Sequence, residues 1–265
     1  MVYLRFMTNQ FKANFTYKVN TYGAILTRLV AMLIQVALWT ALLSNGGTVQ
    51  STAGNVTLRD MVTYAVLSNA LAFLFATNIV QIVGEDIRSG KIATDLMRPI
   101  KYKFYHMSSH VGTSAYNMVF QFLPMLLIGL IFFHVSFPGP LHFGLFILAT
   151  ANAFLINFTM YYLISVLSFW LLKVWQFGFL FQAIMLTFSG QWIPLWFFPD
   201  TLQHVASFLP FQLIYYFPLG MFLHKFEAPQ ILLFFAQQVL WIGILTVAES
   251  FVWGRAKRKL SIQGG

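Results

Sequence analysis

Few residues in this sequence have the types and spacing that chemistry needs. His106 and His110 stand four positions apart, which would place both imidazoles on one helix face, but a structural zinc site needs about four ligands. The segment from Gly84 to Lys91 approaches a phosphate-binding loop, yet five residues instead of four separate its glycines, and Ile92 follows the lysine. No cysteine is present, so thiolate chemistry and disulfide bonds are excluded. The sequence therefore predicts no catalytic residue, no metal site and no cofactor held by the chain itself.

The composition explains why so few residues could carry chemistry. It is the composition of a chain that is surrounded mainly by lipid. Hydrophobic residues make up 58% of the chain and charged residues only 9%, against roughly 25% charged residues in a soluble domain. The net charge of +9 does not indicate nucleic-acid binding, because the basic residues gather in short clusters at the ends of apolar runs. We expect a membrane protein that contacts lipid and not nucleic acid.

Six apolar runs approach or exceed the roughly 20 residues that a membrane-spanning helix needs. They cover residues 22–43, 61–83, 112–135, 141–169, 174–188 and 231–253. Pro124 predicts a kink in the third run, and Arg28 lies near the start of the first, where its side chain can reach the headgroups. The predicted fold is all-α: a polytopic membrane protein with six transmembrane helices in a single domain, residues 1–265.

The first run is preceded by an amphipathic segment, residues 1–21. Apolar residues recur there at helical spacing and predict one apolar face: Leu4, Met7, Phe11, Phe15 and Val19. Basic residues lie among them, so we expect an interfacial helix on an anionic membrane surface. The alternative is a helix packed against a partner.

Two further segments differ from the spans. Residues 84–106, GEDIRSGKIATDLMRPIKYKFYH, are too polar to cross a bilayer. Residues 189–224 are apolar but interrupted by Pro194, Pro199, Pro210 and Pro218, which prevent one straight helix. Short interfacial or re-entrant helices fit the second segment, provided that protein shields their backbone or they line a cavity.

The basic residues predict the orientation in the membrane. Arg59 and Lys225 fall on one side of the predicted spans. The other side carries Arg5, Lys12, Lys18, Arg88, Lys91, Arg98, Lys101, Lys103, Lys173, Arg255, Lys257, Arg258 and Lys259. Because cytoplasmic loops are enriched in lysine and arginine, both termini are predicted to be cytoplasmic.

The order of these features resembles a known family. An amphipathic arm precedes six spans, GKIATDLMRP at 90–99 follows the second span, and a proline-punctuated segment at 189–218 lies between the fifth and sixth. The whole chain is similar to the permease subunits of type 2 ATP-binding-cassette exporters, in particular to small bacterial six-span members. The resemblance implies a bacterial cytoplasmic membrane. The chain lacks the large outer domain that some relatives have, so we do not expect it to handle substrate outside the membrane.

The resemblance implies roles for particular residues. In that family the segment after the second span docks on a cytoplasmic ATPase; we call residues 84–106 the coupling segment. Its implied contact residues are Glu85, Asp86, Arg88, Gly90, Lys91, Asp95, Leu96, Arg98 and Pro99. The family pathway forms between two permeases, mainly from the first, second and fifth spans, which gives as candidate lining residues Gln35, Trp39, Asn78, Gln182, Met185 and Phe188. Residues 189–224 would form short extracytoplasmic helices that cap this pathway.

The implied function is export of a hydrophobic or amphiphilic substrate by a dimer of permeases, either two copies or two related chains. ATP and magnesium would bind separate ATPase subunits, so the chain itself would not be an enzyme. A passive channel or secondary carrier remains the alternative, with the coupling segment as a topogenic signal alone. Against a carrier, the chain shows no internal repeat and no acidic residue deep in a span. An intramembrane enzyme or a scaffold is a third possibility, and the missing catalytic motifs count against the enzyme.

Overall fold

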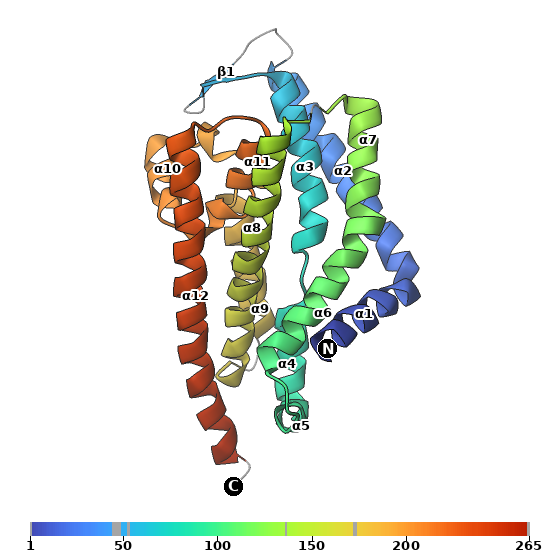
Figure 1. The fold of residues 1–265 in the computed structure, drawn as a ribbon, viewed down its shortest axis with the longest axis vertical. Coiled ribbons are helices and arrows are strands. Elements are labelled where there is room, and N and C mark those ends of the chain that lie inside the picture. The colour runs from blue at the N-terminus through green and yellow to red at the C-terminus, as the bar shows by residue number, and fades with distance from the viewer. Residues whose placement is uncertain (1, 44–48, 52–53, 136, 172–173, 264–265) are drawn as a thin grey trace.

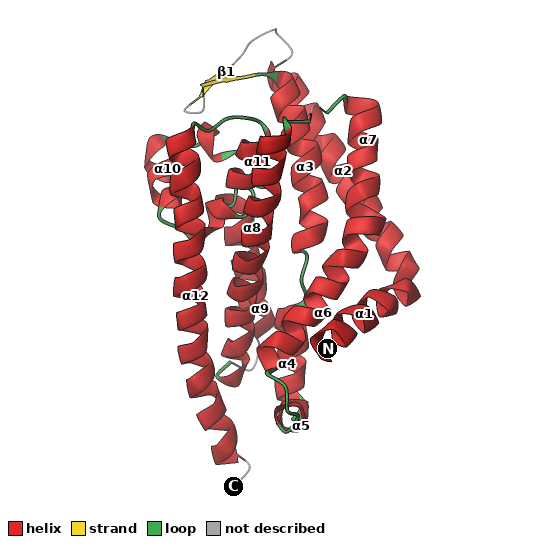
Figure 2. Ribbon diagram, in the orientation of Figure 1, coloured by secondary structure: helices red, strands yellow, loops and turns green. Residues whose placement is uncertain are grey.

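The computed structural model describes residues 2–43, 49–51, 54–135, 137–171 and 174–263. Most of these residues are helical (Figure 2). The helices are α1 Val2–Asn14, α2 Lys18–Leu43, α3 Leu58–Phe75, α4 Ile79–Arg88, α5 Lys91–Leu96, α6 Tyr102–Asn117, α7 Leu123–Phe133, α8 Pro140–Val166, α9 Val174–Phe188, α10 Asp200–Ser207, α11 Tyr216–Phe222 and α12 Ala228–Gln263. Short 3-10 or π-helical turns lie at Phe15–Tyr17, Met118–Phe122, Leu167–Phe169, Leu195–Phe197 and Pro210–Leu213.

Within the described residues, five helical stretches are long and apolar enough to cross a membrane, or six if a bent pair counts as one. The prediction of an all-α polytopic membrane protein is thereby confirmed. The predicted fifth span is the 15-residue helix α9, which is about 22 Å long at 1.5 Å per residue and shorter than the other spans. Figure 1 shows α5 and the C-terminal end of α12 at one end of the molecule, α1 beside α6 in the same half, and α10 and α11 in the other half.

The connection after the first span contains a small antiparallel ribbon of β1 Val49–Ser51 and β2 Gly54–Val56. Lys225 ties the ribbon to the bundle by donating from its Nζ to the Asn55 carbonyl at 2.9 Å and to Asp60 at 2.8 Å. Arg59 donates to the His134 carbonyl at 3.2 Å. The two cations predicted on this side therefore have local partners, whereas Lys173 of the opposite side lies outside the described residues.

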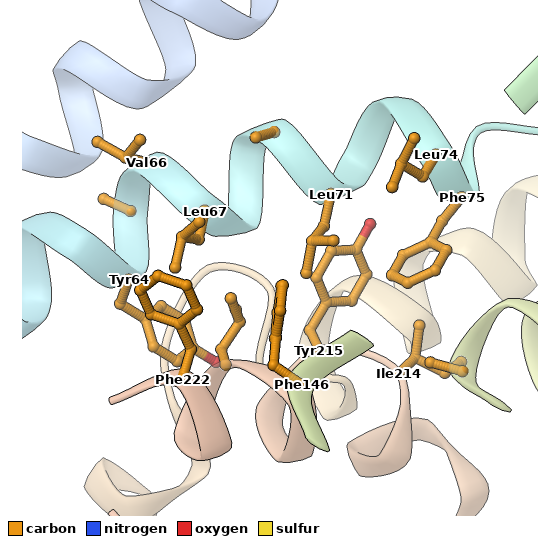
Figure 3. Close-up of a cluster of buried hydrophobic side chains, with 14 of the residues drawn as sticks. Tyr64, Val66, Leu67, Leu71, Leu74, Phe75, Phe146, Ile214, Tyr215 and Phe222 are labelled. Carbon is orange, nitrogen blue, oxygen red and sulfur yellow. The ribbon is translucent and has the colours of Figure 1, made fainter. Parts of the chain in front are cut away.

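Helix α3 forms the centre of the bundle. It is enclosed by α2, α6, α7, α8 and α11, and nearly all of its side chains are buried. Figure 3 shows its Leu67, Leu71 and Phe75 packed toward Phe146 of α8 and Tyr215 before α11. A helix that is apolar around its whole circumference must be surrounded by protein or by lipid, and α3 is surrounded by protein.

The second predicted span, residues 61–83, is interrupted. Helix α3 ends at Phe75, Ala76 is extended, and α4 starts at Ile79. The freed carbonyls find side-chain partners from other helices, each at 2.9 Å: Asn117 donates to Phe73, Ser114 donates to Leu74, and Asn157 donates to Phe75. Because a buried carbonyl without a partner is costly, these three contacts permit the interruption, which we call the α3–α4 break.

The third predicted span is irregular just before Pro124, as predicted. A π-helical turn at Met118–Phe122 joins α6 to α7, and Pro124 is the second residue of α7. Because proline has no backbone N–H, Pro124 cannot donate a helical hydrogen bond. In the π-helical turn before it, the Leu123 N–H donates to the Met118 carbonyl, five residues back. Figure 1 shows α6 and α7 running at different slopes.

Helix α1 packs along α6, and its predicted apolar face is partly wrong. Val19 belongs to α2 and is 82% exposed, because the chain turns at Phe15–Tyr17. Phe11 does face inward, with its ring 5.9 Å from that of Tyr116 in α6. Gly112 allows this approach, because a Cβ there would collide with the backbone of Met7. Leu4 and Phe15 of the predicted face are 61% and 39% exposed, so α1 packs on α6 with part of its apolar surface and leaves the rest uncovered.

The proline-rich segment 189–224 is broken into short helices, as predicted. Pro194 and Pro199 each precede a helical turn, Pro210 starts one, and Pro218 lies in the first turn of α11, where its missing N–H is tolerated. Asp200–Ser207 and Pro210–Phe222 meet at 77°. The segment is anchored by α3 and α2: the Tyr64 hydroxyl donates to the Gly190 carbonyl.

Asn157→Leu is expected to destabilise the protein by about 1–3 kcal/mol, because it keeps the side-chain volume and leaves the Phe75 carbonyl unpaired. Thermal unfolding in detergent checks the expectation. Thr40→Val, which removes an exposed bond within α2, serves as the control and is expected to change stability by less than about 0.5 kcal/mol. Equal effects of the two variants would show that the α3–α4 break does not depend on this contact.

Candidate functional site

The coupling segment is more ordered than its polarity suggests. Gly84–Arg88 forms the last turns of α4, Gly90 turns the chain in a left-handed conformation at φ 74°, and α5 follows as a helix of six residues. Helix α5 ends at Leu96, and Pro99 lies in the turn that leads to α6. A residue with a side chain at position 90 would be strained in this conformation, so glycine suits the turn.

Two carboxylates hold the segment from inside. Asp86 and Asp95 are each only 5% exposed. Asp86 accepts a bond from Lys91 Nζ at 2.6 Å and another from the Tyr102 hydroxyl at 3.0 Å. Asp95 forms an ion pair with Arg98 at 3.2 Å. The hydrogen bond to Asp86 raises the pKa of Lys91 above its usual value, so the lysine stays charged at any physiological pH.

The remaining predicted contact residues divide by exposure. Leu96 is half-buried, whereas the others project from the end of the molecule: Glu85, Arg88, Gly90, Lys91, Arg98 and Pro99. Glu85 and Arg88 form an exposed ion pair at 2.7 Å. The structure therefore distinguishes Asp86 and Asp95, which are buried and shape the segment, from the exposed residues, whose charged members form ion pairs at the surface.

The segment is also fixed to α12, a connection that the sequence did not reveal. The rings of Tyr102 and Trp253 stack with centroids 5.5 Å apart and planes within 5°. Lys103 Nζ contacts Glu249 at 2.7 Å, and these side chains are only 20% and 7% exposed. These contacts join the start of α6 to α12.

A cavity of about 290 Å³ lies beside the α3–α4 break, and we call it the central cavity. Residues of α2, α3, α4, α8 and α9 and of the segment after α9 form its walls. Its polar side chains include Arg28, Gln81, Asn157, Gln182, Gln191 and Tyr215. The cavity thus joins the first, second and fifth predicted spans in one site.

The structure places the six predicted pathway residues in different surroundings. Gln182 and Met185 line the central cavity. Asn78 lies across the break, in a second cavity of about 440 Å³ between α1, α4 and α6. Gln35 donates to the Trp192 carbonyl at 2.8 Å and accepts a bond from Asn69 at 2.9 Å.

Trp39 and Phe188 also contact the proline-rich segment. The Trp39 ring stacks on that of Phe197 with centroids 5.1 Å apart, and the ring centroids of Phe188 and Phe211 are 6.5 Å apart. Gln35, Trp39 and Phe188 therefore join α2 and α9 to that segment, while Gln182 and Met185 face the central cavity. Whether any of the six contacts a substrate stays a prediction.

The most informative residue that the sequence did not assign to the site is Arg28. It lines the central cavity together with Gln191 and Tyr215 from the proline-rich segment, and its predicted reach to the headgroups stays a prediction. The sequence did contain a signal for this assignment, because a cation inside an apolar helix commonly marks a transport pathway.

His106 and His110 are both packed against aromatic rings. His106 packs on the rings of Tyr102 and Tyr105, and His110 stacks on Phe154 at 4.8 Å. Among the described residues, no group of three or more histidine, cysteine or acidic side chains is placed to hold a metal ion.

Comparison with known proteins gives one family. The family model described as "ABC-2 family transporter protein" matches residues 29–264, which is most of the chain. No curated protein matches the sequence.

The Lys103–Glu249 ion pair is expected to contribute more to stability than the exposed Glu85–Arg88 ion pair, although the N–O distance is the same in both. Glu249→Ala leaves a largely buried lysine without a counter-charge and should destabilise the protein by on the order of 3 kcal/mol. Glu85→Ala removes the exposed pair with Arg88 and should cost about 1 kcal/mol or less. Thermal unfolding of both variants in detergent makes the comparison, and a larger loss for Glu85→Ala would contradict it.

Proposed function

The chain belongs to the ABC-2 family of transporter membrane proteins, and on this premise we propose that it is the permease subunit of an ATP-driven exporter. It would work with separate cytoplasmic ATPase subunits that bind ATP and magnesium, because membrane subunits of this family normally lack ATPase activity. Its substrate would be hydrophobic or amphiphilic. The setting is the bacterial cytoplasmic membrane, with both termini in the cytoplasm.

The observation that carries the proposal is the coupling segment. Its exposed charges lie at the same end of the molecule as the C-terminal end of α12 (Figure 1). Its buried carboxylate Asp86 fixes it to α6 through Tyr102, so α4, α5 and the start of α6 can move as one body. A loop that served only as a topogenic signal would need no such internal anchors.

The α3–α4 break supplies the place where this motion is absorbed. Helix α3 is held in the core, whereas α4 follows it after the non-helical stretch Ala76–Asn78 and packs against α8 and α9. When ATP binding closes the ATPase pair, the coupling segments of two permeases are drawn together and α4 shifts against α3. Ala76, Thr77 and Val80 line the central cavity, so this shift changes the shape and access of the cavity.

A second permease completes the proposed pathway. Helices α2 and α9 flank the central cavity and present exposed apolar side chains, among them Val30, Trp175, Phe179 and Leu180. A second copy of this chain or a related permease would cover this face, and the substrate would pass between the two.

A pull-down of the tagged protein from gently solubilised membranes, followed by mass spectrometry, tests the ATPase partner. We expect a cassette ATPase with the wild type and its loss with Glu85→Ala, Arg88→Ala and Arg98→Ala combined, because these side chains are exposed on the coupling segment. Lys12→Ala, an exposed change on α1, is the matched control and should retain the partner. Absence of an ATPase from the folded wild type would favour a passive channel or carrier instead.

The orientation is testable because the native chain contains no cysteine. Met97 in the coupling segment is 86% exposed, and Thr201 is exposed on α10. A membrane-impermeant thiol reagent added to intact cells should label Thr201→Cys and not Met97→Cys, and inverted vesicles should give the reverse. Labelling of Met97→Cys in intact cells would overturn the predicted orientation.

A further inference from the structure

Arg28 is a cation without a partner at the wall of the central cavity. It lies in the second half-dozen residues of α2, is half-buried, and forms no hydrogen bond or ion pair with any described residue. It shares the cavity with Tyr215 and Gln191, so it faces the proline-rich segment and not the amphipathic helix α1. A half-buried guanidinium is costly unless it meets water or an anion.

No acidic side chain of the chain is placed to neutralise it. The sequence has seven acidic residues. Those in ion pairs are Asp60, Glu85, Asp86, Asp95 and Glu249, each with a different cation or set of cations. Asp200 starts α10 and Glu227 directly precedes α12. Among the described residues that line the central cavity, none is acidic, so the cavity carries one uncompensated positive charge.

The rest of the wall suits an amphiphile. Trp175, Phe179 and Met185 from α9 provide an apolar surface, and Gln81 and Gln182 add amide groups that can donate hydrogen bonds. The volume of about 290 Å³ lies near the lower limit of small-molecule sites, roughly 300–1,000 Å³. The cavity therefore fits a polar headgroup with part of an apolar chain.

The other two large cavities lack this feature. The cavity of about 440 Å³ between α1, α4 and α6 has Lys91 and Asp86 in its wall, and these two pair with each other at 2.6 Å. The cavity of about 510 Å³ between α3, α6, α7 and α8 is lined almost entirely by apolar side chains. The uncompensated charge distinguishes the central cavity from both.

We propose that the central cavity binds an anionic amphiphile, whose carboxylate, phosphate or sulfonate group is held by Arg28 and whose apolar part lies against Trp175, Phe179 and Met185. Arginine suits this role because its planar guanidinium donates two parallel hydrogen bonds to such groups. The inference rests on the proposed function in one respect: it takes the central cavity to be part of the transport pathway, and so it names the class of substrate.

The test uses two photoreactive probes that differ in charge alone, a diazirine-bearing long-chain fatty acid and its methyl ester. The full-length protein is reconstituted in phosphatidylcholine nanodiscs, irradiated with each probe, and digested, and the labelled peptides are identified by mass spectrometry. The wild type should give labelling of α9 by the carboxylate probe that exceeds labelling by the ester at equal membrane concentration.

Substitution of Arg28 then isolates the charge. Arg28→Gln should raise the concentration of the carboxylate probe needed for half-maximal α9 labelling by about tenfold or more, because a charge-assisted contact is lost. The ester should be unaffected, and Arg28→Lys should retain part of the preference. Arg59→Gln, which removes a cation outside the cavity, is the matched control. Thermal unfolding of each variant confirms that it is folded.

Equal α9 labelling by the two probes, or labelling of Arg28→Gln equal to that of the wild type, would overturn the proposal. Adding phosphatidylglycerol distinguishes the sources of the anion: suppression of labelling identifies a phospholipid headgroup as a ligand, and no suppression identifies a smaller anionic amphiphile. The assay contains no ATPase, so its result is independent of the pull-down. Loss of the Arg28 effect would leave the exporter proposal intact, and absence of an ATPase would leave the anion site intact.

Discussion

The structure depends on one constraint: backbone carbonyls freed at membrane depth must find donors within the protein. Asn117, Ser114 and Asn157 meet this constraint at the end of α3 by donating to three successive carbonyls. Their bonds do two things at once. They fix α3 to α6 and α8, and they allow the chain to leave the helix at Ala76, so that α4 starts as a new helix and the central cavity can form beside the break.

A related constraint governs the proline-rich segment. Its short helices leave many polar backbone groups, and amide side chains from the long helices meet some of them. Gln35 donates to the Trp192 carbonyl, and Gln238 donates to the Leu213 carbonyl and to the Ala149 carbonyl. The amides in the spans thus join helices to irregular backbone as well as to one another. This keeps the non-helical part enclosed by α2, α8, α9 and α12.

Charge is used differently at the two functional regions. In the coupling segment, buried Asp86 and Asp95 are neutralised by neighbouring cations, which makes a rigid unit with an exposed polar surface. In the central cavity, Arg28 is left without a counter-charge, which suits a site that receives its anion from a ligand. A segment anchored by buried ion pairs and a cavity with an uncompensated cation are the two features on which the proposed transport role rests.

The sequence by itself determined much of this protein. Apolar runs, their lengths and four prolines predicted the spans and the broken segment at 189–224, and the motif order indicated the family, because these features depend on neighbouring residues along the chain. The α3–α4 break was missed because Ala76, Thr77 and Asn78 contain no helix breaker, and the groups that stabilise it lie 40 to 82 positions away. For the same reason the sequence could not separate buried Asp86 from exposed Glu85, or show that Gln35 holds backbone while Gln182 faces a cavity. Burial, the direction of a side chain and the absence of a partner for Arg28 are decided by which helices meet, and only the tertiary structure specifies that.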